Sequence, residues 1–258
     1  MQETNFIQWI LLSLIQGLTE YLPISSSAHL ILVSEVMGWK DQGLVMDIAA
    51  HGGSLIAVMW YFREELAKLF QGKNWLLFNK LAIASIPIAL TGYLLADFID
   101  SNLRKPTVIA ASSIVFGLLL YVADKISKKT KQRPKSIKMK NAVLIGLTQV
   151  CALIPGASRS GVTMSAAMAQ GFTRTKAAEF SFLLAIPTLL MTTAYGFLKM
   201  VKQPEDYNLL GVMVVLFVSF FASLFSMKLF LKVIEKTPIS LFVWYRIVLA
   251  VLIIWLLR

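Results

Sequence analysis

One short segment of the chain gathers an acid, hydroxyl groups and a histidine within a few helical turns. Gln16 and Glu20 are four residues apart, so on a helix their side chains share one face. Their oxygen atoms suit Mg²⁺ or Ca²⁺, cations that prefer oxygen ligands and can bridge to a phosphate. Three serines follow Pro23 at positions 25–27, and His29 comes one helical turn after the second of them. This pattern predicts acid–base chemistry on a phosphorylated substrate.

A second segment carries an arginine in a similar setting. Arg159 lies between Ser158 and Ser160, directly after the Pro155-Gly156 turn. A turn that opens a helix leaves backbone N–H groups unpaired, and these groups bind anions together with the positive end of the helix dipole. A guanidinium group donates two parallel hydrogen bonds to phosphate oxygens. We therefore expect an anion-binding turn here, facing the serines at 25–27.

Each polar residue also has a structural interpretation. Serines in membrane helices often hydrogen-bond to carbonyl groups or allow close helix contacts. His29 is compatible with a hydrogen-bonded interior histidine, and Arg159 with an ion pair to Glu20 that locks the two segments together. The clustering of serines after a proline in both segments favours the functional interpretation.

The composition indicates what kind of chain must position these segments. Its 258 residues are 57% hydrophobic and 15% charged, with a mean hydropathy of +0.69, whereas soluble domains average about 25% charged residues. These values exclude an ordinary soluble domain and a disordered chain. Cys151 is the only cysteine, which excludes an internal disulfide and, with two histidines, disfavours a structural zinc site. We predict an all-α, polytopic membrane protein.

Six apolar stretches meet or nearly meet the length of about 20 residues that a helix needs to cross a bilayer. They are 48–62, 81–96, 108–123, 180–198, 209–227 and 240–257. Two further apolar regions, about 5–34 and about 141–172, are interrupted by the polar segments. Their halves are too short to cross, which is typical of re-entrant hairpins. Broken helices persist at membrane depth only when they are buried in protein or line a wet cavity.

The basic residues predict the orientation of the chain. The formal net charge is +11, and eight basic residues with no acid fall in the loop 125–140. They are Lys125, Lys128, Lys129, Lys131, Arg133, Lys135, Lys138 and Lys140. The positive-inside rule places this loop in the cytoplasm, and six spans with two re-entrant hairpins then place both termini outside. The loop lacks interleaved aromatic residues, which disfavours nucleic-acid binding.

The two polar segments resemble each other and divide the chain in two. Each has a glutamine, Gln16 or Gln149, then an apolar turn, a proline and clustered serines. Three spans follow each segment, and because three is odd the second half enters the membrane in the opposite orientation. We predict a single membrane domain built as an inverted-topology repeat, 1–124 and 141–258. Such repeats commonly place a site at their interface near the bilayer midplane.

Three other ionisable residues lie in or near the spans. Arg246 is expected to have a structural role, either by pairing with Glu179 or by reaching an interface. His51 lies near the start of the span 48–62, which favours a helix-end or interfacial role.

The two segments together closely resemble the signature motifs of the undecaprenyl-diphosphatase family, also called the bacitracin-resistance family. The motifs cover 16–29 and 155–163, and the chain length, motif separation and span count also agree with the family. The resemblance implies an enzyme of the bacterial cytoplasmic (inner) membrane that hydrolyses undecaprenyl diphosphate to undecaprenyl phosphate and phosphate. This reaction recycles the lipid carrier of cell-wall synthesis and confers bacitracin resistance.

The resemblance also implies roles for individual residues. The implied catalytic residues are Glu20, Ser26, His29 and Arg159, with Ser26 or a water molecule as the nucleophile. The implied substrate-binding residues are Ser25, Ser27, Ser158, Ser160, Gly161 and Thr163. A divalent cation, Mg²⁺ or Ca²⁺, would be bound by Glu20 with help from Gln16, in a site open to the outer face. Many family members have a second glutamate where this chain has Gln16, which leaves Glu20 as the main anionic ligand.

A transporter is the main alternative class. Inverted repeats with broken helices are typical of transporters, and such a protein would move undecaprenyl phosphate between leaflets, alone or in addition to hydrolysis. The expected partners are a polyprenyl diphosphate lipid and membrane lipids. The sequence leaves the oligomeric state open, and a homo-oligomer is one alternative. We expect no cleavable signal peptide, because 6–33 lacks a basic start and a processing site.

Overall fold

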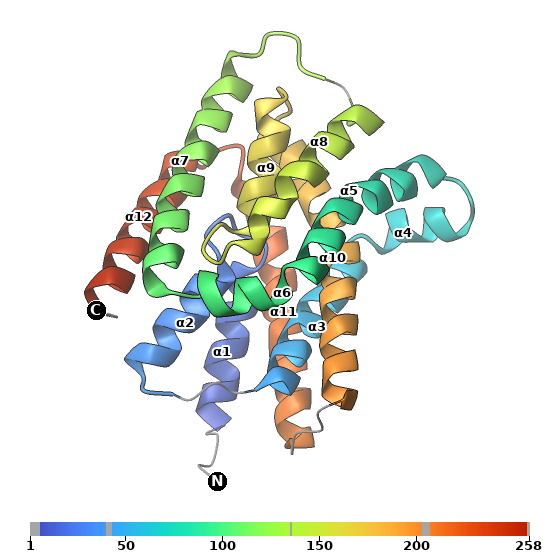
Figure 1. Ribbon diagram of the computed structural model, residues 1–258. Coiled ribbons are helices and arrows are strands. Elements are labelled where there is room, and N and C mark those ends of the chain that lie inside the picture. The colour runs from blue at the N-terminus through green and yellow to red at the C-terminus, as the bar shows by residue number, and fades with distance from the viewer. Residues whose placement is uncertain (1–5, 40–42, 135, 203–206, 257–258) are drawn as a thin grey trace.

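The structure is a computed structural model that describes residues 6–39, 43–134, 136–202 and 207–256. Lys135 of the basic loop lies outside the described residues, as do positions 5 and 257 at the ends of predicted segments. Within the described ranges every regular element is a helix (Figure 1).

All six predicted spans form helices that are long and apolar enough to cross a membrane, which confirms the prediction of a multi-pass membrane protein. They are α3 (Leu44–Tyr61), α5 (Trp75–Leu94), α7 (Pro106–Lys129), α10 (Arg174–Lys202), α11 (Leu209–Val233) and α12 (Ile239–Leu256). Most extend past the apolar runs, because flanking lysine side chains are long enough to keep their charge at the interface.

Four shorter helices come from the two interrupted regions. They are α1 (Phe6–Thr19), α2 (Ser26–Val36), α8 (Met139–Gln149), which continues as the 3₁₀-helix η2 (Val150–Leu153), and α9 (Arg159–Ala169). None is long enough to cross a bilayer core. In Figure 1 the α1–α2 pair and the α8–α9 pair extend toward opposite ends of the molecule, and their turns meet near its middle.

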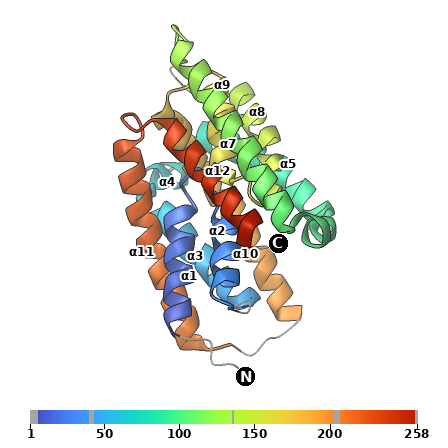
Figure 2. The ribbon, with the colours of Figure 1, turned by 90° about the vertical axis from the view of Figure 1, so that its left-hand side faces the viewer.

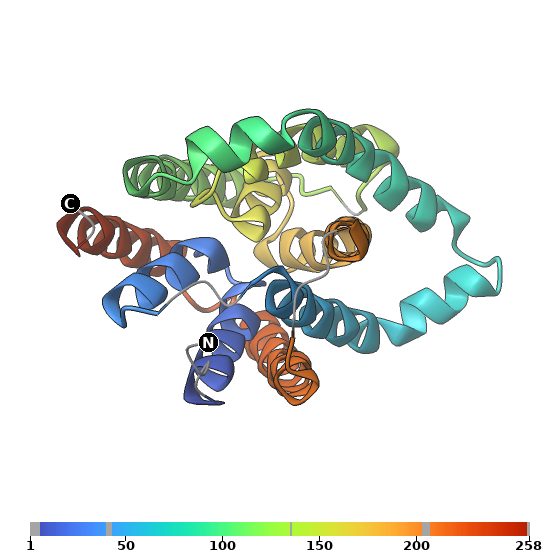
Figure 3. The ribbon, with the colours of Figure 1, turned by 60° about the horizontal axis from the view of Figure 1, so that its bottom comes forward.

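The long helices surround these turns in an interlocked arrangement. α11 packs against α3 and α1, α12 packs against α7, and α5 packs against α8; Figure 2 shows α1 alongside α11 and α12 crossing α7. α10 contacts α3, α5 and α9 and lies inside the ring of helices in Figure 3. The remaining elements are α4 (Arg63–Phe70), α6 (Ala96–Phe98) and the π-helix η1 (Ile99–Leu103).

Small residues allow the helices around α11 to approach closely. A Cβ atom on Gly53 of α3 would lie 2.3 Å from the carbonyl oxygen of Leu216 in α11. Beside this contact the hydroxyl of Ser54 lies 3.1 Å from that of Ser219 and 3.0 Å from that of Ser223. Lipid tails are as apolar as the outer surfaces of the helices, so helix association in a membrane depends on close packing and hydrogen bonds of this kind. They fix α3, which carries part of the cavity described below.

A buried ion pair ties α7 to α10 at the end of the molecule away from the two turns. Arg174 donates to both carboxylate oxygens of Asp124, at 2.6 and 2.9 Å. Its remaining nitrogen donates to three carbonyl oxygens of the α11–α12 connection, those of Ile234, Glu235 and Thr237. Because one charge neutralises the other, the side chain of Arg174 can remain buried.

Candidate active site

The two polar turns share an uncommon backbone conformation. Ser25 and Ser158 each directly precede a helix and have φ angles of 71° and 69°, in the left-handed region. Residues other than glycine seldom adopt such angles, which cost about 1–3 kcal/mol each and persist only where the surroundings enforce them. Because strain of this kind clusters at functional sites, both turns are candidates for binding or chemistry.

Each helix that follows a turn begins with hydroxyl groups. Oγ of Ser158 accepts a hydrogen bond from the N–H of Gly161 at 3.2 Å, which caps α9, and also lies 3.1 Å from Oγ of Ser160. In the first turn, Oγ of Ser25 lies 3.1 Å from Oγ of Ser27. Hydroxyl and backbone N–H donors are therefore concentrated at the N-termini of α2 and α9, an arrangement that favours anion binding.

Contacts between the turns bring the two halves of the site together. Oγ of Ser160 donates to the carbonyl oxygen of Leu22 at 2.7 Å. Nη2 of Arg159 lies 3.0 Å from Oε1 of Glu20, and these side chains are only 10% and 8% exposed. The ion pair that the sequence left open as an alternative for Arg159 is therefore present, between residues 139 positions apart.

The Glu20 carboxylate accepts hydrogen bonds on both of its oxygens. Arg159 bonds to Oε1, while Nε2 of Gln16 and Oγ of Ser26 donate to Oε2 at 2.9 and 3.0 Å. Charge-assisted bonds of this kind favour the ionised carboxylate and fix its orientation. Because the Ser26 hydroxyl already donates to a carboxylate, a proton acceptor is in place if that oxygen acts as a nucleophile.

The guanidinium of Arg159 is held from several sides. Its Nη1 donates to the carbonyl oxygen of Ser181 at 2.9 Å, and its central carbon lies 5.7 Å from the centroid of the Tyr21 ring. Oγ1 of Thr163 lies 2.7 Å from Oγ of Ser181. Thr163 thus lies behind Arg159, where it stabilises the α10 segment that accepts from the guanidinium.

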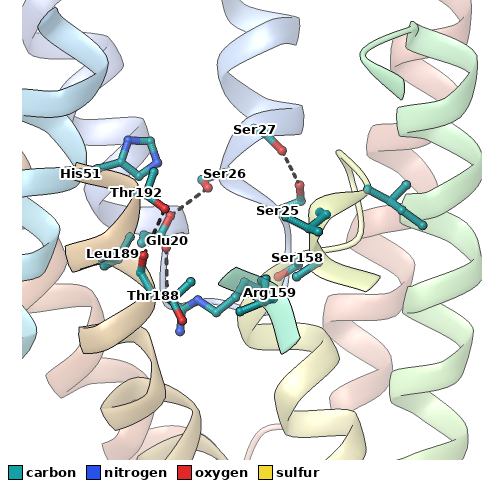
Figure 4. Close-up of a pocket in the computed structure, with 14 residues that line it drawn as sticks. Glu20, Ser25, Ser26, Ser27, His51, Ser158, Arg159, Thr188, Leu189 and Thr192 are labelled. Carbon is teal, nitrogen blue, oxygen red and sulfur yellow. Dashed lines mark hydrogen bonds and ion pairs between the residues drawn. The ribbon is translucent and has the colours of Figure 1, made fainter. Parts of the chain in front are cut away.

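A cavity of 210 Å³ lies beside the ion pair, and Figure 4 shows Glu20 and Arg159 on its wall. Six of the residues that the sequence singled out line it: Glu20, Ser25, Ser26, Ser27, Ser158 and Arg159. The rest of the wall consists of His51, Ile88, Ala152, Leu153, Ile154, Thr188, Leu189 and Thr192. The cavity therefore joins both turns to α3, α5 and α10, and its wall carries charged and hydroxyl groups as well as apolar side chains.

His29 is not among the residues that line this cavity. Its Nδ1 lies 2.7 Å from the carbonyl oxygen of Ser25, and its Nε2 lies 2.5 Å from the hydroxyl of Tyr245, on which the ring stacks. Because a carbonyl oxygen only accepts, Nδ1 carries the proton and Nε2 accepts from the tyrosine. The structure therefore places His29 behind the first turn, and the proton-transfer role expected for it stays a prediction.

Three cavity residues were missed as candidates. His51 lies well inside α3, and not at its end as expected, with its Nδ1 2.9 Å from the carbonyl oxygen of Asp47. An ionisable residue within an apolar span was the signal that should have selected it. Thr188 and Thr192 follow Pro187 in α10 at a spacing of four residues, which places both on one helix face.

Arg246 does not pair with Glu179, which was one of the two structural roles considered for it. Glu179 is exposed, whereas Arg246 is fully buried and donates to backbone carbonyl oxygens of α7 and of both turns. The structural role expected for Arg246 thus takes a different form, because carbonyl groups, which carry no residue-specific signature, are its partners.

The oxygen atoms of Glu20 and Gln16 are of the kind that a hard divalent cation prefers, although Gln16 is buried and does not line the cavity. Oε1 of Gln16 is buried and has no hydrogen-bond partner in the described part of the chain, although it belongs to a side chain that contacts Glu20. A buried amide oxygen without a donor is costly, and a cation would satisfy it. The described residues contain no cluster of three or more acidic, histidine or cysteine side chains. One carboxylate and one amide oxygen match the sparse protein ligation of Mg²⁺, which takes its other ligands from water and substrate phosphate.

Comparison with known proteins decides the family. The model of the bacitracin resistance protein BacA family matches residues 9–252, a range that contains both turns and all six long helices except the last residues of α12. The chain belongs to the BacA family. Undecaprenyl-diphosphatases from Colwellia psychrerythraea and Teredinibacter turnerae are each 42% identical to it, over 96% of this chain and 98% of theirs. The family resemblance of the two motifs is thereby confirmed.

Proposed function

We propose that this BacA-family protein is an integral membrane phosphatase that hydrolyses undecaprenyl diphosphate to undecaprenyl phosphate and phosphate. The observation that carries the proposal is the Arg159–Glu20 pair on the wall of a cavity between two serine-rich turns. The names of the two relatives favour this hydrolase over the transporter alternative. Such an enzyme would recycle the lipid carrier of cell-wall synthesis and confer resistance to bacitracin.

Phosphate release by the purified protein in detergent tests the proposal. With undecaprenyl diphosphate we expect stoichiometric release of phosphate and of undecaprenyl phosphate, and none from a Glu20→Gln control prepared in parallel. Equal release by both proteins would attribute the activity to a contaminant and would overturn the proposed function. Movement of the lipid in sealed vesicles by the Glu20→Gln protein would instead support transport.

The binding step follows from the donors that converge on the cavity. Phosphoryl transfer requires positioning and neutralisation of oxygen charge more than covalent chemistry. Arg159 and the N-termini of α2 and α9, with Ser25, Ser27 and Ser158, would hold the diphosphate while its prenyl chain stays in lipid. Ser160 and Gly161 do not line the cavity, and they would support this site through their bonds to Leu22 and Ser158. A divalent cation bound by Glu20 and Gln16 would neutralise charge on the phosphate oxygens. Thr163 would support this arrangement through the contact behind Arg159.

Two nucleophiles fit the geometry, and Ser26 is the one with a proton acceptor in place. If Ser26 attacks, its oxygen bonds to the terminal phosphorus, its proton passes to Glu20, and the bridging P–O bond breaks to release undecaprenyl phosphate. Water then hydrolyses the phosphoserine and regenerates the hydroxyl. If water attacks directly, it replaces Ser26 in the first step and no covalent intermediate forms.

Substitution of the Ser26 hydroxyl separates these routes. If Ser26 is the nucleophile, Ser26→Ala will lower kcat at least 10³-fold and rapid quenching of the wild type will trap phosphoserine. Ser27→Ala, which removes a neighbouring hydroxyl, serves as the matched control and is expected to act mainly on KM. Full activity in Ser26→Ala would eliminate this residue as the nucleophile and leave water.

The two histidines of the chain should respond differently to substitution. His51 faces the cavity with Nδ1 committed to a carbonyl oxygen, which leaves Nε2 to contact the terminal phosphate or the nucleophile. We therefore expect His51→Ala to lower kcat about 10²-fold, on the scale of general acid–base catalysis, with partial rescue by added imidazole. His29→Ala should lose activity through the Ser25 turn, without such rescue. Rescue of the His29 variant alone would restore the proton-transfer role to His29.

We also propose that α1–α2 and α8–α9 are re-entrant hairpins of an inverted repeat in the bacterial cytoplasmic membrane. In such a repeat α1, α3 and α5 of the first half correspond to α8, α10 and α11 of the second. The observed packing of α3 on α11 then corresponds to the observed packing of α10 on α5, and that of α1 on α11 to that of α8 on α5. The basic loop 125–140 would then lie in the cytoplasm and the cavity would open to the outer face.

In a Cys151→Ser background, Lys131→Cys should react with an impermeant thiol reagent only after cells are opened, and Lys105→Cys should react in intact cells. The reverse pattern would invert the topology.

A further inference from the structure

Arg246 is the largest fully buried side chain of the described residues, and the mechanism above does not use it. It lies in α12, remote in sequence from both turns, yet its guanidinium reaches each of them. Its Nη1 donates to the carbonyl oxygen of Pro23 at 3.2 Å, in the first turn. Its Nη2 donates to those of Gly156 and Ala157, both at 2.9 Å, in the second turn, and its Nε to that of Ser113 in α7, at 2.9 Å.

The charge of Arg246 has no acidic partner among the described ion pairs. The other two arginines buried near helix junctions, Arg159 and Arg174, are each paired with a carboxylate, Glu20 and Asp124. Burial of a charge without a counter-ion is costly, and carbonyl dipoles offset that cost only in part. A charged residue present within a membrane-spanning helix without a counter-ion is a candidate for a functional role.

The hydrogen bonds of Arg246 also determine which way the second turn faces. A trans peptide unit places its N–H opposite its carbonyl oxygen, and no peptide bond described in the chain is cis. Since the carbonyl of Ala157 faces Arg246, the N–H of Ser158 points away from it, and within the described residues that N–H has no hydrogen-bond partner. Ser158 lines the cavity. Arg246 thus leaves a backbone donor at the N-terminus of α9 unpartnered within the described chain, on a residue that lines the cavity.

From this geometry we propose that Arg246 is a positioning residue of the active site. It fixes the first and second turns at one separation, so that Ser26 and Arg159, the first residues of α2 and α9, face the same cavity. Its unneutralised charge also favours an anionic ligand on the opposite side of the turns. The proposal rests on the proposed phosphatase function and adds to it a residue that acts through the two turns without contacting substrate.

Substitution of Arg246 by lysine tests the role, because lysine keeps the charge but cannot span four carbonyl groups. We expect Arg246→Lys to remain folded in detergent and to lower kcat/KM at least tenfold, mostly through kcat. The matched control is Arg174→Lys, a change of the same kind at a buried arginine remote from the cavity, which should lower thermal stability and leave kcat within twofold. Equal losses of kcat in the two variants would show a general packing effect and overturn the proposal.

A second measurement separates positioning from simple destabilisation. If Arg246 acts by placing Arg159, the loss from Arg246→Lys should be much smaller in an Arg159→Lys background than in the wild type. If Arg246→Lys lowered kcat/KM by the same factor in both backgrounds, the result would contradict the proposal.

A glycine pair provides the same test if the lysine variant does not fold. A Cβ on Gly161 would lie 3.0 Å from Nη1 of Arg246, whereas one on Gly117 would make ordinary contacts at 3.5 Å. Gly161→Ala should therefore lower kcat severalfold in the wild type but much less in an Arg159→Lys background, whereas Gly117→Ala should not lower it in either. Equal activity in both variants would count against positioning by Arg246.

A binding measurement tests the role of Arg246 if the proposed phosphatase function fails. Should the wild type release no phosphate, the affinity of the purified protein for inorganic pyrophosphate is measured in its place. We then expect at least tenfold weaker binding to Arg246→Lys and unchanged binding to Arg174→Lys. Unchanged pyrophosphate affinity in Arg246→Lys would overturn the inference independently of the enzyme assay.

Discussion

Replacement of Arg159 by alanine should lower kcat for undecaprenyl diphosphate about 10²- to 10³-fold. The guanidinium is the only charged donor from the second turn on the cavity wall, and it is held by Ser181 and Tyr21 before any substrate arrives. Loss of one preorganised donor to developing oxygen charge costs about 2.7–4 kcal/mol in enzymes. The expected loss therefore falls on the transition state and not only on binding.

The Arg159→Ala result needs two controls. Arg104→Ala removes an exposed arginine that pairs with Asp100 and does not line the cavity, and it should leave kcat unchanged. Arg159→Lys keeps the charge but not the two-pronged donor, so its activity should fall between those of alanine and the wild type. Near-normal turnover in Arg159→Ala, with the folded fraction verified by gel filtration, would overturn the assignment of the active site.

Much of the fold could be predicted because each membrane-spanning helix requires a continuous run of about 20 apolar residues, which is visible in the sequence. Six spans were readable from apolar runs bounded by lysines and turn residues, since every backbone polar group in lipid must be satisfied within a helix. Pro23 and Pro155 marked the places where this rule is broken. Polar residues that gather at such breaks need partners, which is why the ion pair between Glu20 and Arg159 could be anticipated.

The direction of individual side chains could not be predicted, because it depends on how distant helices pack. His29 shares a motif with Ser26, and that proximity suggested a shared role. The rotation of α2 against α12 turns His29 toward Tyr245, a residue 216 positions away. His51, by contrast, is remote from both motifs and reaches the cavity only because α3 packs against α10 and α11.

The partners of Arg246 were hidden for a different reason. The sequence offered Glu179 as one partner and an interface as the alternative, because a buried arginine is usually paired with a carboxylate. Backbone carbonyl groups occur at every position, so a side chain that binds four of them leaves no pattern in the residues it contacts. Only the closed turns at Pro23 and Gly156 bring those oxygens to one point.

Substitution of Glu20 by glutamine should have the largest effect of all. The change keeps the shape of the side chain and one oxygen acceptor for Arg159 and Ser26, but it removes the charge. Three functions then fail together: the ion pair with Arg159, the acceptance of the Ser26 proton, and the anionic ligand for Mg²⁺ or Ca²⁺. We expect phosphate release to fall below detection, at least 10³-fold, because these losses act on one step.

The metal contribution can be isolated from the other two. Chelation of divalent cations should abolish the activity of the wild type, and Mg²⁺ or Ca²⁺ should restore it. In Gln16→Ala the carboxylate and its ion pair remain, so that variant should keep a measurable rate and require at least tenfold more cation for half-maximal activity. Wild-type activity that persists after chelation would remove the cation from the mechanism and leave Arg159 to neutralise the phosphate.

The stability of the Glu20 variants separates catalysis from folding. Removal of one partner of a buried ion pair costs about 3–5 kcal/mol, because the remaining charge is left without compensation. Glu20→Gln should therefore also unfold at a lower temperature in detergent. Addition of Arg159→Met removes the orphaned charge and should restore most of that stability, since both partners are then neutral and of similar volume. If activity returned with stability in the double variant, the pair would be a structural lock between the two halves and not part of the reaction site.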